Sequence, residues 1–169
     1  RTISGKRFES SSHVLLTGRN ELHVTRIHPS SELGSGDAIM PVRGEGIYNF
    51  NGRRFKVEVV GRESIESLKQ PEGVIMLDAD RLRFPFVLRR WRNGDWFIPF
   101  GMRGKKKVSD LFTDLKYDSL MKSYAVMIVD TMAEGLAENQ HVAGVACVRI
   151  DNMYRVSDKT DSIIRIKEI

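Results

Sequence analysis

The sequence has few of the features that mark secreted or membrane proteins. Among 169 residues there is a single cysteine, Cys147, so no disulfide can form within the chain. This suits the reducing cytoplasm. No apolar run approaches the ~20 residues that a transmembrane helix needs, and no secretory signal peptide is visible. We therefore expect a cytoplasmic protein with no membrane partner.

Motifs for nucleotide, metal and covalent chemistry are also missing. Gly5-Lys6 lacks a preceding glycine-rich loop, which argues against nucleotide binding there. His13, His23 and His28 lack the fixed spacing of a metal motif. No nucleophile and base stand at a recognisable spacing. We therefore expect no catalytic residue, no metal site and no cofactor in this chain.

What is present is enough hydrophobic sequence for a real core, at 41% of residues, and local patterns of an α+β fold. Asn51-Gly52 between two alternating runs is the signal of a two-residue β-hairpin. Apolar residues at i, i+3, i+4 and i+7 predict a helix from about Lys107 to Lys116. The other expected elements are strands at 13–17, 21–27, 74–78, 84–90, 126–130, 141–150, 153–157 and 163–169, and a short helix at 64–69.

A domain boundary is predicted at the helix-breaking segment 70–73, which reads Gln-Pro-Glu-Gly. Residues 1–73 would form a β-rich linker or substrate-binding region that begins with a polar, serine-rich stretch at 1–12. Residues 74–169 would form a mixed α/β domain of about six strands and two or three helices.

Positive charge is concentrated in one window, Arg81–Lys107. The window holds nine basic residues and one acid, a net charge of +8, whereas the whole chain carries +5. The remainder is therefore negative, and the basicity is a local feature that is typical of a polyanion-binding site. Arginine suits phosphate oxygens, and four aromatic residues interleave with the charges, as where bases stack on rings. These four are Trp91, Trp96, Phe97 and Phe100.

Two plainer interpretations stay open. The charges could form a solvated face, and Trp91 and Phe97 could belong to the core. The start of the helix at Lys107 adds an argument for anion binding, because free backbone N–H groups emerge beside Lys105–Lys107.

The same stretch resembles a known family. Its pattern, LR-x-W-x-x-GD-x-F-x-P-x-G-M-x-G-x-x-K-x-SD, is similar to the C-terminal domain of tRNA(Ile)-lysidine synthetases, also called synthases. A second block, from Val148 to Val156, resembles the closing segment of that domain, whereas Trp96 stands where the family usually has arginine. The matching residues of the first block are Leu88, Arg89, Trp91, Gly94, Asp95, Phe97, Pro99, Gly101, Met102, Gly104, Lys107, Ser109 and Asp110.

The resemblance implies an enzyme that joins lysine to the wobble cytidine of tRNA(Ile), using ATP and magnesium. The ATP loop of that family, SGGxDS, does not occur in this chain. The chain therefore resembles the C-terminal part of the ligase without its catalytic domain, with tRNA(Ile) as the partner. The domain would hold the acceptor-stem side of the tRNA. The expected RNA contacts are Arg89, Arg90, Arg92, Arg103, Lys105, Lys106 and Lys107.

Two rival hypotheses come from other classes of function. One is a small catalytic domain in which Asp95 or Asp110 acts as a general acid or base. The other is a structural or dimerisation module of a tRNA-modifying enzyme without direct RNA contact. The sequence leaves a homodimer open.

Overall fold

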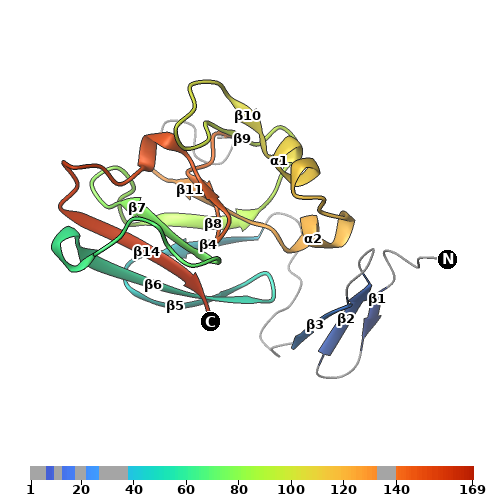
Figure 1. Ribbon diagram of the computed structural model, residues 1–169. Coiled ribbons are helices and arrows are strands. Elements are labelled where there is room, and N and C mark those ends of the chain that lie inside the picture. Colours follow the sequence, from blue (N-terminus) through green and yellow to red (C-terminus); the bar gives the residue numbers. More distant parts are fainter. Residues whose placement is uncertain (1–6, 10–12, 18–21, 27–37, 133–139) are drawn as a thin grey trace.

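The structure, a computed structural model, describes residues 7–9, 13–17, 22–26, 38–132 and 140–169. These residues form a mostly β protein with few short helices (Figure 1). The expected α+β class is therefore right in its β-sheets, whereas the helices are a smaller part of the fold than that class implies. The helices are α1 (Val108–Asp114), α2 (Ser119–Tyr124) and two single 3₁₀ turns, η1 (Arg62–Ser64) and η2 (Asn152–Tyr154). No helix of the described part of the chain is both long and apolar enough to cross a membrane.

Two antiparallel sheets form the body of the protein. One has the order β13-β12-β11-β8-β4 and the other has the order β5-β6-β14-β7. The strands of the five-stranded sheet are β4 (Ile39–Val42), β8 (Phe86–Arg90), β11 (Val126–Asp130), β12 (Gly144–Val145) and β13 (Arg149–Ile150). The strands of the four-stranded sheet are β5 (Gly46–Phe50), β6 (Arg53–Gly61), β7 (Val74–Asp78) and β14 (Ser162–Glu168).

The two sheets pack face to face over a shared apolar core. Phe55, Leu77 and Ile166 enter it from the four-stranded sheet, and Phe86 and Ile128 enter it from the five-stranded sheet; none of them exposes any surface. Successive strand residues point to opposite faces, so the same register sends every second residue of each strand away from this core.

A third layer covers the other face of the five-stranded sheet. Met127 and Val129 of β11 pack there against Leu111 and Phe112 of α1. The ribbon of β9 (Trp96–Phe97) and β10 (Lys106–Lys107) lies in the same layer, as the upper part of Figure 1 shows. Phe97 joins this second core and is fully buried. Both faces of β8 and β11 are therefore covered.

A third antiparallel sheet stands at the start of the chain. It has the order β1-β2-β3, with β1 (Arg7–Glu9), β2 (His13–Thr17) and β3 (Leu22–Arg26). Strands β2 and β3, which pair with each other, confirm the two strands predicted at 13–17 and 21–27. The stretch predicted as a linker contributes strand β1, and the rest of residues 1–12 lies outside the described residues.

Local sequence signals are confirmed where they depend on near neighbours. Asn51 and Gly52 both have positive φ, at 52° and 73°, and Phe50 pairs with Arg53 and Tyr48 with Phe55, as a two-residue hairpin loop requires. Strand β7 matches its prediction, and the helix expected from Lys107 is α1.

Three predicted elements are wrong. The run 141–150 does not form one strand, because a turn at Cys147, with φ of 63°, folds β13 back onto β12. Burial raises the pKa of the Cys147 thiol to about 11. Residues 153–157 form no strand, because 153 and 154 belong to the η2 turn and 155–157 follow it. The helix expected at 64–69 does not form either, because the η1 turn ends at Ser64.

The boundary predicted at residue 73 does not separate two cores. Strand β6 pairs with β14 along seven residues, and β4 pairs with β8. Residues from both sides of the segment 70–73 therefore complete the same two sheets. Residues 38–73 therefore form one folded unit with the described residues after them, 74–132 and 140–169. Binding of substrate by residues 1–73 stays a prediction.

This shared core can be tested with Phe55→Ala. The substitution removes a fully buried ring and should lower the free energy of unfolding by ~3–5 kcal/mol. Both tryptophans lie beyond residue 73, so urea unfolding followed by tryptophan fluorescence should report the full loss. Arg54→Ala, an exposed change on the same strand, is the control. A tryptophan transition that ignores Phe55→Ala would show that residues 38–61 fold separately.

Candidate nucleic-acid interface

Eight of the nine basic residues of the window lie in three separate places, and Arg92 lies between β8 and β9. Arg81 and Arg83 are exposed in the turn between β7 and β8. Arg89 and Arg90 end β8, at the other end of that strand. The last group belongs to residues 98–107, which comprise the connection after β9 and strand β10; we call this segment the basic loop. It carries Arg103, Lys105, Lys106 and Lys107 and no acidic residue.

Arg89 is not on the surface, which corrects its prediction as a phosphate contact. Its side chain is 3% exposed and forms a two-pronged ion pair with Asp95, in which Nη1 and Nη2 lie 2.8 Å from Oδ2 and Oδ1. The physical reason is strand alternation: Arg89 shares a face of β8 with Val87, toward the α1 layer. Sequence alternation alone could not assign a solvent face, because both faces of β8 are covered.

The Asp95 carboxylate ties several segments together. Oδ2 also accepts a hydrogen bond from the backbone N–H of Arg92, at 2.8 Å. The Asp95 carbonyl accepts from the N–H of Val108, the first residue of α1. Gly94, with φ of 95°, makes the tight turn that brings Asp95 back under β8. Both oxygens of Asp95 are thereby committed inside the protein, which argues against its role as a general acid or base.

Arg90 points to the opposite face of β8 from Arg89 and is half-buried. Its Nε donates to Oδ1 of Asn51 at 3.0 Å, in the hairpin turn between β5 and β6. The same Asn51 donates to the carbonyl of Ser123, at the end of α2. Arg90 therefore braces the two sheets and is not part of the basic loop.

The basic loop is fixed at its base by the closing segment of the chain. The N–H of Ile98 donates to Asp151 at 2.7 Å, and the N–H of Gly101 donates to Asn152 at 3.1 Å. In return the N–H of Asn152 donates to the Ile98 carbonyl at 2.7 Å. Asp151 is fully buried. These contacts connect the two blocks of the family pattern, which are about fifty residues apart in sequence.

Lys105 stands over a stacked pair of rings. Trp96 and His141 are parallel within 3°, with ring centroids 4.2 Å apart. The Lys105 ammonium lies 4.0 Å from the Trp96 centroid, and it must use the other ring face because His141 occupies the first. His141 Nε2 in turn lies 2.6 Å from Asp151. The contact between a cation and an aromatic ring orients Lys105 and leaves its charge in place.

The other cations in and beside the basic loop differ in their exposure and in their ion pairing. Arg103 and Lys107 are exposed, Lys106 pairs with Asp114, and Arg92 beside the loop is half-buried. The start of α1 offers an anion fewer free backbone N–H groups than expected, because the N–H of its first residue, Val108, donates to the Asp95 carbonyl. The helix is also short, at seven residues. Anion binding here would depend on side chains. Asp110, in the first turn of α1, is exposed.

Sequence reasoning missed His141, Asn152 and Arg149. The resemblance pointed to the block that holds Arg149 and Asp151, but it gave no partner for them. Neither His141 nor Asn152 shows any local pattern, because each meets the basic loop only through tertiary contact.

Comparisons with known proteins agree on one family. No family model matches the chain. The tRNA(Ile)-lysidine synthase of Parabacteroides distasonis is 32% identical over 160 residues, which is 95% of this chain and 34% of that protein. The synthase of Bacteroides thetaiotaomicron is 28% identical over 163 residues, or 96% of this chain and 33% of that protein. The chain thus spans about a third of the length of these relatives.

The fold is found in a solved structure as well. The crystal structure of a TILS C-terminal domain matches with a TM-score of 0.63 and covers 78% of this chain and 95% of that one. The sequence identity is 14%, so this likeness shows the shared fold alone.

The buried ion pair generates a stability prediction. Arg89→Ala leaves the Asp95 carboxylate buried without its guanidinium, and should lower the free energy of unfolding by ~3–5 kcal/mol in urea melts. Arg103→Ala, an exposed change in the basic loop, should stay within ~0.5 kcal/mol of the parent. Equal stabilities for the two variants would mean that the pair does not hold this part of the fold.

Proposed function

Because the chain is homologous to the C-terminal part of tRNA(Ile)-lysidine synthases, we propose that it binds tRNA(Ile) through the basic loop. The complete enzyme would ligate lysine to the wobble cytidine with ATP and magnesium, and those steps would belong to a catalytic domain that is not in this chain. This part would hold the acceptor-stem side of the tRNA.

One observation supports this proposal most directly. Within the described residues, the basic loop gathers four cations without an acid of its own, on a base held by buried polar contacts of Asp95 and Asp151. Positioned cations lose less conformational freedom when they meet phosphates than cations on a flexible arm. Exposed Arg103 and Lys107 and the ring-supported Lys105 are therefore the main contacts, with Lys106 and Arg92 beside them.

The structure changes the set of expected contacts. Arg89 is buried in its ion pair with Asp95, and the Nε of Arg90 donates a hydrogen bond to Asn51. The number of phosphates neutralised is therefore closer to four than to seven.

The proposal predicts a definite salt dependence. With about four cations on phosphates, log affinity for tRNA should fall against log salt with a slope of roughly −3 to −4. Filter binding or fluorescence anisotropy across a salt series measures it. Lys105→Ala and Lys107→Ala should each make the slope shallower by up to ~1. Arg54→Ala, on the outer face of the other sheet, is the matched control and should leave the slope unchanged.

The test also distinguishes the rival hypothesis. A structural or dimerisation module would bind tRNA weakly, and its binding would not respond to the lysine substitutions. Affinity that is flat across the salt series would exclude the phosphate role.

A further inference from the structure

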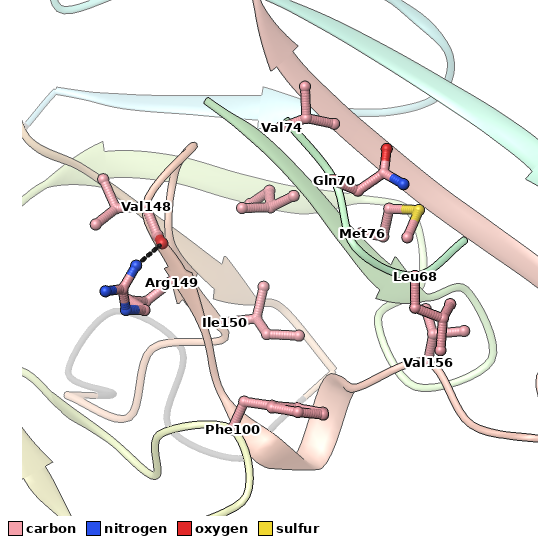
Figure 2. A pocket seen from close by; sticks show the side chains of 10 residues that line it. Leu68, Gln70, Val74, Met76, Phe100, Val148, Arg149, Ile150 and Val156 are labelled. Atoms are coloured by element: carbon pink, nitrogen blue, oxygen red, sulfur yellow. Dashed lines mark hydrogen bonds between the residues drawn. The ribbon is translucent and has the colours of Figure 1, made fainter. Parts of the chain in front are cut away.

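An apolar pocket opens beside the basic loop. Its volume is about 260 Å³, which is below the ~300–1,000 Å³ usual for drug-sized ligands and suits a single flat ring system. The buried floor includes Ile75, Met76 and Val156. Figure 2 shows Arg149 at one end of the lining, Leu68 and Val156 at the other end, and Phe100 between them.

The rim carries an exposed aromatic ring. Phe100 is the second residue after Ile98, which is held by Asp151, and its side chain is 63% exposed, although it lines the pocket. Arg149 is also in the lining, but its guanidinium is held by a 2.9 Å hydrogen bond to the Val148 carbonyl and points away from Ile150 and the pocket (Figure 2). Gln70 adds an amide at the rim.

The charge around the pocket is asymmetric. Phe100 belongs to the basic loop, and Arg103 follows three residues later, so their Cα atoms lie at most ~11 Å apart. Residues 66–72, which contribute Leu68 and Gln70 to the lining, carry Glu66, Lys69 and Glu72, a net charge of −1. A ligand with an apolar flat part and an anionic part would place its anion on the side of Phe100 and the basic loop.

We propose that this pocket receives one unpaired nucleobase of the bound RNA. The proposal rests on the tRNA-binding function and makes it more specific. Unstacked bases bind on aromatic rings and arginine planes, and amide groups read their edges. The base would stack on Phe100, and its phosphates would meet the cations of the basic loop. A paired stem cannot enter the pocket, so the site would select a single-stranded end or loop.

The experiment compares two RNAs: a hairpin with a blunt stem, and the same hairpin with a single-stranded 3′ extension that contains 2-aminopurine. The parent chain should bind the extended RNA roughly tenfold more tightly, as expected for stacking of one base. The 2-aminopurine emission should be quenched on binding. Phe100→Ala should abolish both the preference and the quenching, while its affinity for the blunt hairpin and its melting temperature stay near those of the parent.

Two further variants sharpen the test. Phe100→Leu keeps an apolar side chain but no ring, so it should also lose the quenching. Met102→Ala removes another exposed apolar side chain of the basic loop that does not line the pocket, and it should behave like the parent.

The failures are distinguishable. Equal binding of both hairpins by the parent chain, or a preference that survives Phe100→Ala, overturns the base pocket and leaves tRNA binding through the basic loop standing. Absence of binding to both hairpins and to tRNA overturns both proposals.

Discussion

The position of the basic loop depends on one buried interaction, the ion pair of Arg89 and Asp95. An isolated charge in a protein interior is very costly, and a pair is tolerated only when its remaining hydrogen-bonding groups are satisfied. Here the carboxylate also accepts from the Arg92 N–H, and Arg89 donates to the Arg90 carbonyl at 3.0 Å. Two apolar side chains of similar size could fill the same space, but they could not bind these backbone groups. The pair therefore determines where the turn after β8 goes.

Contacts of Asp95 and of Asp151 connect that turn to the surface of the protein. Asp95 holds the start of α1 through its carbonyl, and β9 follows it directly. Asp151 then holds the other side of the loop base and orients His141, which stacks on one face of Trp96, and Lys105 lies over the other face of Trp96. Two buried carboxylates thus position a strongly cationic segment. Both carboxylates lie inside the protein, where they repel an approaching polyanion less than exposed acids would, whereas Asp114, the partner of Lys106, is exposed.

Much of the fold could be predicted where the signal is local. The Asn51-Gly52 turn, strand β7 and the helix α1 follow from residues close in sequence. The pairing of β6 with β14 could not be predicted, because the two strands are separated by about a hundred residues and share only a general alternation. For the site, charge identified the basic loop but misplaced Arg89. Sequence composition counts an arginine equally whether it faces solvent or a buried aspartate, and only the covered faces of β8 distinguish the two.

The place of β14 in its sheet has a consequence for how the chain is made. This strand lies between β6 and β7, and it is the last element of the described chain to leave the ribosome. At ~5–20 residues per second, β6 emerges on the order of 5–20 s before its partner. During that interval β6 and β7 each present an unpaired edge, with Val57 and Ile75 unburied. A nascent chain that stalls before residue 162 would be a candidate for chaperone capture or degradation, because no earlier strand can take the central position.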